Sequence, residues 1–152
     1  TKLKNKEYDA IVLSLAGIQM LSLINQVKEI FTVEQMLPAI GQGAIALQCK
    51  KDDQKTLSIL ESINHKETYY CIQAERALLE AIGGDCDTAI GGLAKLSNDE
   101  ISLKSELFSN DGKKKFKFEC SGHFSEAKEI GYKVGKELLK KAGPNFTTQE
   151  DQ

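Results

Sequence analysis

Four cysteines are the side chains whose chemistry could decide the function of this sequence: Cys49, Cys71, Cys86 and Cys120. None lies two or four residues from another, so their spacing gives neither a zinc knuckle nor a CxxC redox pair. We expect Cys49, Cys71 and Cys120 to be small, buried hydrophobic residues. Cys86 differs, because it lies in the glycine-rich stretch at residues 83–87. A thiol on a tight loop between two regular elements can serve as a point of covalent attachment.

The surroundings of Cys86 argue against a nucleophile that activates itself. Asp85 and Asp87 flank it, and it follows the C-terminal end of a predicted helix. Negative charge and the negative end of a helix dipole both disfavour a thiolate, which also disfavours a thiol redox protein. Neither His65 nor His123 is linked to Cys86 by a motif, and we expect both to lie on the surface or to cap a helix. A thiol captured once by a strong electrophile needs no depressed pKa, and it gives a permanent thioether.

Two regular elements position this loop. A helix is predicted from about residue 67 to residue 82, with apolar side chains mostly on one stripe. These side chains are Ile72, Ala74, Ala77, Leu78, Ala81 and Ile82. Gly83 and Gly84 end the helix in the manner of a C-cap, and a strand is predicted over residues 88–96.

The sequence on either side completes the fold class, which is α+β. The further elements are a helix at residues 56–63, strands at 101–108 and 115–120, and a last helix that begins near Ser125 as its N-cap. The two strands alternate apolar and polar residues and are joined by a hairpin turn at residues 110–112. Ile130, Val134 and Leu138 give the last helix its apolar stripe. From about residue 52 onward we therefore expect a three-stranded antiparallel sheet packed on helices.

The N-terminal part of the sequence predicts half of an α/β unit. Residues 8–15 form an apolar run typical of a buried strand, and a helix is expected from Ala16 to about Ile30, with Gly17 at the turn. Open α/β sheets bind ligands at the carboxyl ends of their strands, so residues 13–20 could be the wall of a site. A purely structural turn is an equally good interpretation.

Gly41 and Gly43 flank Gln42 and would let the backbone approach another group closely. Residues 44–49 follow as a second predicted buried strand. A nucleotide-binding loop is not indicated, because the pattern lacks the Lys-Ser/Thr pair of such loops. The charged residues 50–54 mark a domain boundary.

The bulk properties fit one ordinary domain, or a small domain with a piece of another. The 152 residues are 41% hydrophobic and 28% charged, with a net charge of −2, so neither nucleic acid nor an anionic membrane is an expected partner. No apolar run approaches the length of a membrane span and no signal peptide opens the sequence, so we expect a cytoplasmic, reducing compartment. Because the first residue is Thr1, we expect a fragment, a processed form or a trimmed chain.

Several stretches of the sequence resemble one family. They are YDAIVLSLAGIQML at residues 8–21, LPAIGQGAIALQCKKDD at 37–53, INHKET at 63–68 and QAERALLEAIGGDCDTAIGGLA at 73–94. In this order and with little gapping, they resemble the C-terminal half of hydroxymethylbilane synthase, also called porphobilinogen deaminase. The resemblance implies that residues 1–51 are a partial α/β segment, which closes the family's second domain and returns a strand to the first. It implies that residues 52–152 are the C-terminal α+β domain that carries the cofactor cysteine.

The resemblance also implies a reaction. The family is a transferase of tetrapyrrole (haem) biosynthesis that joins four porphobilinogen molecules into hydroxymethylbilane and releases ammonia. A dipyrromethane cofactor primes this polymerisation, and the resemblance implies that Cys86 holds it through a thioether. Porphobilinogen is then the small-molecule substrate.

The remaining site residues follow from the resemblance as well. Gln42 and Gly43 match positions that line the cofactor cleft, and Leu13 and Ser14 match positions whose backbone faces the pyrrole acetate and propionate groups. Lys2 falls where the family usually has a carboxylate-binding Arg. A lysine keeps the charge but loses the bidentate fork of the guanidinium group.

Some positions depart from the family pattern. Met20 replaces a usual Arg, Asp85 replaces the second glycine of a usual GGC, and Ala89 replaces a usual Pro. The catalytic aspartate and several arginines belong to the family's N-terminal half, so we nominate no catalytic residue and no metal ligand here. We expect that half to be a partner, and the chain alone to be inactive. The alternative is a non-catalytic module of the same fold that binds a partner or a tetrapyrrole.

Overall fold

The computed structural model of the chain describes residues 2–84, 88–143 and 146. The chain divides into two units, Thr1–Gln35 and Met36–Gln152. The first contains α1 (Leu15–Met20) and the 3-10 helix η1 (Ile24–Gln26). The second contains α2 (Gln54–Ile63), α3 (Lys66–Ile82), β1 (Ile90–Ser97), β2 (Glu100–Phe108), β3 (Lys115–His123), the 3-10 helix η2 (Phe124–Glu126) and α4 (Ala127–Ala142).

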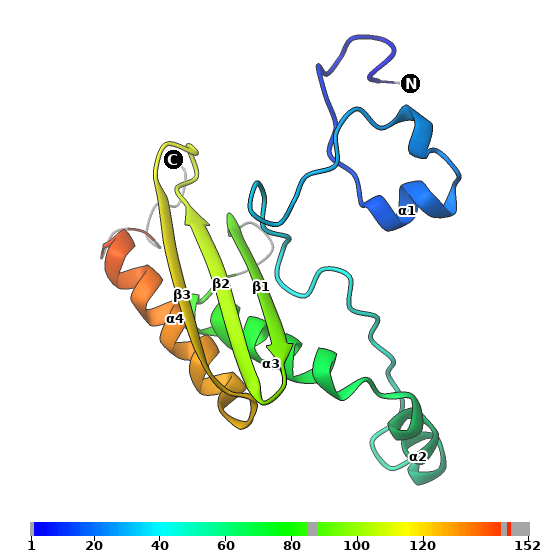
Figure 1. Cartoon of the computed structure of the whole chain (residues 1–152), viewed down its shortest axis with the longest axis vertical. Coiled ribbons are helices and arrows are strands. Elements are labelled where there is room, and N and C mark those ends of the chain that lie inside the picture. The colour runs from blue at the N-terminus through cyan, green and yellow to red at the C-terminus, as the bar shows by residue number, and fades with distance from the viewer. Residues whose placement is uncertain (1, 85–87, 144–145, 147–152) are drawn as a thin grey trace. The chain divides into compact units, whose positions relative to one another are not determined.

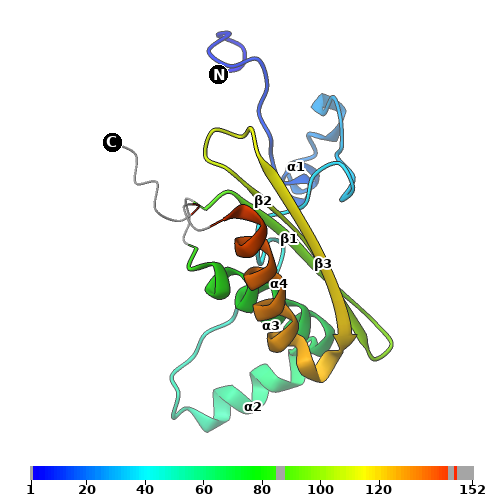
Figure 2. The same ribbon diagram turned by 90° about the vertical axis from the view of Figure 1, so that its left-hand side faces the viewer.

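The second unit is a three-stranded antiparallel sheet in the order β1-β2-β3. Helices α3 and α4 lie side by side on one face of this sheet (Figure 1), and the view turned by 90° shows the two layers edge-on (Figure 2). In the register, Leu103 of β2 stands opposite Ala94 of β1 and Cys120 of β3. The α+β prediction for this part of the chain is confirmed.

The core lies between the sheet and these two helices. Its largest fully buried side chains are Leu78, Ile101, Leu103, Leu107, Val134 and Leu138. Alternate residues of β2 supply three of them, because successive side chains of a strand point to opposite faces. The other three come from the apolar stripes of α3 and α4, so the helical and strand periodicities that the sequence predicted are both confirmed.

Helices α3 and α4 approach each other closely at two glycines of α4. A Cβ atom added at Gly131 would lie 2.2 Å from the Ala74 carbonyl oxygen, and one added at Gly135 would lie 2.6 Å from the Ala81 Cβ. A side chain at either position would therefore collide with α3. The absence of one lets the backbones of α3 and α4 pack at short range.

The ends of the helices carry specific caps. The N–H of Thr68 donates to His65 Nδ1 at the start of α3, and the N–H of Ser125 donates to His123 Nδ1 at the start of η2. Both histidines are caps, in line with the prediction that each lies on the surface or caps a helix. Ser125 is not the N-cap that the sequence predicted, because the chain forms the short helix η2 first and α4 follows from Ala127.

The predicted strands of the N-terminal part are wrong. Residues 8–14 and 44–49 are irregular, and apolar side chains there are exposed, for example Val12 (65%) and Ile45 (91%). The predicted helix from Ala16 to Ile30 is reduced to α1 and η1. A strand needs a neighbour that accepts and donates its ladder hydrogen bonds, and the described residues form no strand beside these segments. Apolar character alone therefore did not produce secondary structure.

On β2, Glu106 is a buried carboxylate held by two lysines of β3, Lys115 and Lys117. Burial opposes its charge, but the hydrogen bonds and charges of the two lysines outweigh burial and lower the pKa of Glu106. A carboxyl group whose pKa is lowered on folding stabilises the fold above its unfolded pKa of about 4.3, and this contribution is lost as the pH falls through the folded value.

We therefore expect Glu106→Gln to reduce the loss of stability that the chain suffers between pH 7 and pH values below about 4. Urea midpoints of both proteins at the two pH values measure this loss. Glu119→Gln is the control, because Glu119 pairs with Lys104 at 3.9 Å on the exposed face of the sheet. If the urea midpoint fell by the same amount between the two pH values in wild type and in Glu106→Gln, the result would contradict the expectation.

Candidate functional site

The predicted attachment residue, Cys86, lies outside the described residues, but both flanks of its loop are described. Helix α3 ends at Gly83, whose φ of 69° is in the left-handed region, and the N–H of Gly84 donates to the Leu79 carbonyl at 3.1 Å. A Cβ at Gly84 would lie 2.8 Å from Leu79 Cδ1 and 3.0 Å from Thr88 Oγ1. Gly84 and Thr88 are therefore neighbours in space, and a side chain at residue 84 would require the Leu79 and Thr88 side chains to shift.

The second flank is held by the sheet. The N–H of Ile90 donates to the Thr88 carbonyl at 2.8 Å, and the N–H of Phe108 donates to the Ala89 carbonyl at 2.9 Å. The latter bond continues the pairing of β1 with β2 by one residue. A capped helix and a paired strand thus fix the chain on both sides of residues 85–87.

The other three cysteines are half-buried. Cys71 and Cys120 contact the hydrophobic core, whereas Cys49 lies in the irregular segment at residues 44–49 and does not contact that core. The prediction that these three cysteines are buried is therefore wrong in degree, most clearly for Cys49. Burial raises the pKa of the Cys71 thiol and the charge of Glu75 raises it further, against a backbone hydrogen bond from Leu96. Cys71 is accordingly a poor nucleophile.

The segment with Gln42 and Gly43 forms a tight turn. Gly41 and Gly43 have φ values of 74° and 86°, in the left-handed region that favours glycine. Within the turn, the N–H of Gln42 donates to the Ala39 carbonyl at 3.0 Å. The glycines are thus required by backbone conformation, which refines the prediction that they permit a close approach.

This turn is attached to β1 and α3. The N–H of Gly92 donates to the Pro38 carbonyl at 2.9 Å, and a Cβ at Gly92 would lie 2.5 Å from Ile40 Cδ1. The N–H of Gly41 donates to the Glu75 carboxylate of α3 at 2.7 Å. Gln42 and Gly43 are therefore positioned by the same helix and strand that flank the loop of Cys86.

Glu75 was missed by the sequence reasoning, although a signal for it existed. It is only 4% exposed and lies on the apolar stripe of α3, one turn from Cys71 and three residues from Leu78. A carboxylate at a stripe position requires a buried hydrogen-bond partner. Its two partners, Gly41 and Ala94, are distant in sequence and could not be named from periodicity.

The other predicted site residues belong to the unit Thr1–Gln35. Ser14 precedes α1, and its carbonyl accepts the N–H of Ile18 at 3.2 Å, while its side chain makes no capping bond. Leu13 is 61% exposed. Lys2 Nζ lies 5.7 Å from the centroid of the Tyr8 ring. Within this unit, the structure places Leu13 and Ser14 together at the start of a helix.

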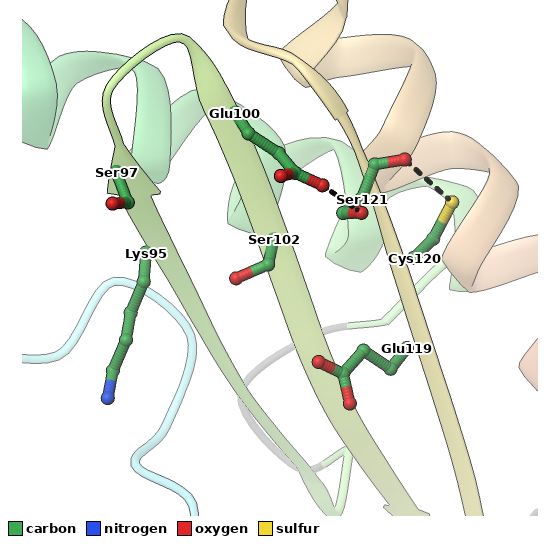
Figure 3. Close-up of a pocket in the computed structure, with 7 residues that line it drawn as sticks. All are labelled: Lys95, Ser97, Glu100, Ser102, Glu119, Cys120 and Ser121. Atoms are coloured by element: carbon green, nitrogen blue, oxygen red, sulfur yellow. Dashed lines mark hydrogen bonds between the residues drawn. The ribbon is translucent and has the colours of Figure 1, made fainter.

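A pocket lies on the sheet of the second unit. Its lining consists of Lys95, Ser97, Glu100, Ser102, Glu119, Cys120 and Ser121 (Figure 3). Glu100 accepts a hydrogen bond from Ser121 Oγ at 2.6 Å. None of the predicted site residues lines this pocket, and its carboxylate at residue 100 is already bound within the sheet, so we do not regard it as the functional site.

The described ranges, 2–84, 88–143 and 146, lack two kinds of feature. No helix in them is long and apolar enough to cross a membrane. No group of three or more His, Cys, Asp or Glu side chains in the same ranges could hold a metal ion.

Comparison with known proteins gives two family matches. Residues 1–58 match the model "Porphobilinogen deaminase, dipyromethane cofactor binding domain", and residues 69–140 match "Porphobilinogen deaminase, C-terminal domain". The curated relatives include porphobilinogen deaminases of Coxiella burnetii strains CbuG_Q212 and RSA 493 / Nine Mile phase I. Each is 40% identical over 151 residues, which is 99% of this chain and 49% of the relative.

The chain thus spans about half the length of the curated relatives that it matches. The two models describe consecutive parts of one kind of protein, and they follow each other here in order. The α+β unit with its three-stranded sheet agrees with the second of them. On these grounds, the chain belongs to the porphobilinogen deaminase family.

Proposed function

We propose that this chain is the cofactor-bearing part of an enzyme that joins four porphobilinogen molecules into hydroxymethylbilane, with release of ammonia. The observation that carries the proposal is the match of two successive porphobilinogen deaminase domains, over residues 1–58 and 69–140. We further propose that a dipyrromethane is attached to Cys86 through a thioether. Cys86 lies in the second matched region, and the model described as cofactor-binding matches the first.

The attachment step needs only a thiol and a carbon electrophile. Porphobilinogen that has lost ammonia is an azafulvene; the Cys86 sulfur would form a bond to its exocyclic methylene carbon, and the thiol proton would pass to the ring nitrogen. Asp85 and Asp87 disfavour a thiolate, which suits a residue that reacts once and then stays alkylated. The flanks at Gly84 and Thr88 support this assignment, because both are fixed to regular elements next to residues 85–87.

The other residues of the chain would bind and orient the cofactor. When attached, dipyrromethane supplies the pyrrole carbon that attacks the incoming electrophile. Gly41 and Gly43 adopt backbone conformations that leave Gln42 on a narrow turn, and the backbone of Leu13 and Ser14 would face the carboxylate groups. Lys2 would contribute one positive charge.

This donor set fits a carboxylate-bearing cofactor only in part. Lys2 is the single cation among the predicted site residues, and Met20, at a usual arginine position, is 87% exposed and brings no charge. The remaining cations and a general acid would come from the family's N-terminal half, which we propose as the partner of this chain. The small number of cations and the lack of an assigned general acid also favour the second candidate function, a non-catalytic module that binds a partner or a tetrapyrrole.

We expect the purified 152-residue chain to consume no porphobilinogen, because it contains no group that we can assign to protonate the leaving amine. A chimera in which the chain replaces the matching stretch of the Coxiella burnetii enzyme should produce hydroxymethylbilane. Porphobilinogen consumption is measured for both, with the unmodified Coxiella enzyme as the control. Steady turnover by the chain alone would contradict the need for a partner, and a folded chimera without turnover or adduct would favour the non-catalytic module.

A further inference from the structure

Glu75 is a buried carboxylate without a cationic partner among the described residues. It lies on α3, is 4% exposed, and none of the ion pairs within residues 2–84, 88–143 and 146 includes it. Buried carboxylates are retained when hydrogen bonds replace the lost water. Its contacts therefore indicate what it holds in place.

Both carboxylate oxygens of Glu75 accept a backbone N–H. Oε2 accepts the N–H of Gly41 at 2.7 Å, and Oε1 accepts the N–H of Ala94 at 2.9 Å. Gly41 precedes Glu75 by 34 residues and Ala94 follows it by 19. One side chain thus joins the turn of Gln42 and Gly43, helix α3 and strand β1.

The bond to Ala94 falls on the outer edge of the sheet. Strand β1 pairs with β2 on one side only, and the N–H groups of Gly92 and Ala94 do not take part in that pairing. The Pro38 carbonyl accepts the first, and Glu75 accepts the second. The Pro38 carbonyl and the Glu75 carboxylate therefore accept the hydrogen bonds that a neighbouring strand would otherwise accept at Gly92 and Ala94.

We propose that Glu75 is a positioning residue, which holds the Gly41-Gln42-Gly43 turn against β1 and so sets the place of Gln42 and Gly43 relative to α3 and β1. A contact of Gln42 and Gly43 with a cofactor rests on the proposed function. The attachment of their turn through Glu75 does not. Burial raises the pKa of Glu75, against the hydrogen bonds from Ala94 and Gly41.

The electrostatic surroundings of Glu75 are simple. Among the residues that the structure describes, Cys71, one turn earlier on α3, is a titratable side chain that interacts with Glu75. The segment at residues 36–43 contains no titratable side chain, and Lys95 of β1 lines the pocket on the other face of the sheet. A pH-dependent signal at Gly41 and Ala94 can therefore be assigned to Glu75.

The test uses the ¹⁵N-labelled 152-residue chain. In the wild type, the amide proton shifts of Gly41 and Ala94 should follow one titration with an apparent pKa above the usual range of glutamate. In Glu75→Gln this titration should vanish, and amide exchange at Gly41 should accelerate about tenfold or more, while exchange at Leu103 and Leu138 stays unchanged. Glu67→Gln, an exposed glutamate of the same helix, should leave all four signals as they are.

The outcomes separate this proposal from the proposed function. Unchanged exchange at Gly41 in Glu75→Gln, or no common titration in the wild type, would overturn the positioning role. If the variant fails to fold, the wild-type titration decides.

In the chimera, Glu75→Gln should lower dipyrromethane occupancy several-fold relative to Glu67→Gln, as intact mass measures. Full dipyrromethane occupancy in Glu75→Gln, together with faster amide exchange at Gly41, would overturn the proposed effect of the turn on cofactor binding. A parent chimera without dipyrromethane would overturn the proposed function, while the amide signals would still support the attachment of the turn.

Discussion

Replacing Cys86 with serine is expected to abolish hydroxymethylbilane production by the chimera while leaving its fold intact. The contacts on either side of residues 85–87 belong to Gly84, Thr88 and Ala89, so the change removes none of them. Stability should change by no more than about 0.5 kcal/mol, as for most substitutions outside the core. Production should fall almost to zero, because a hydroxyl group is a poorer nucleophile than a thiol and the growing product would have no anchor.

Intact-mass analysis measures the adduct directly. Cys71→Ser and Cys120→Ser are matched controls, because both change one sulfur to oxygen in half-buried residues that contact the core. They should lower the urea midpoint and retain the mass of the dipyrromethane. An adduct that survives Cys86→Ser, or that is lost in Cys71→Ser, would assign the attachment to a different sulfur.

Gly131→Ala is expected to destabilise the α+β unit by about 1–3 kcal/mol, the usual cost of overpacking a core. The added Cβ would lie 2.2 Å from the Ala74 carbonyl oxygen, and a helical backbone cannot yield locally as a side chain can. Alanine has a higher helix propensity than glycine by about 1 kcal/mol, which offsets part of the loss. The remainder reflects the separation of α3 from α4.

Urea unfolding of wild type and variant measures this difference. Lys136→Ala introduces the same side chain at an exposed position of α4 and should shift stability by no more than about 0.5 kcal/mol. If Gly131→Ala proved as stable as wild type, the close approach of the two helices would not contribute to the fold in the way that the distances indicate.

The sequence predicts those helices and strands whose apolar face packs on another element of the described chain. The stripe of α4 and the alternation of β2 are confirmed because each faces the other across one core. Residues 8–15 and 44–49 have an equally apolar sequence, but a strand is a property of a pair, and no second strand is described beside them. Periodicity reports which side of a segment is apolar and not whether a partner is present.

Some features of the candidate site also follow from local sequence, whereas others depend on segments far apart in the chain. The cap at Gly83 and the positive φ values at Gly41 and Gly43 follow from local sequence, because glycine tolerates the left-handed region. The attachment of the turn through Glu75 depends on three segments far apart in the chain, so local patterns could not identify it. The roles of Cys86, Gln42, Gly43, Leu13, Ser14 and Lys2 remain predictions.

The covered edge of β1 has a consequence for self-association. An exposed strand edge is a template on which another chain can add a strand and start aggregation. Here the N–H groups of Gly92 and Ala94 already donate to Pro38 and Glu75, and proline itself has no N–H to offer an incoming strand. A second molecule would have to displace a buried carboxylate to extend the sheet on this side, so the chain blocks amyloid-like stacking there without using a strand of its own.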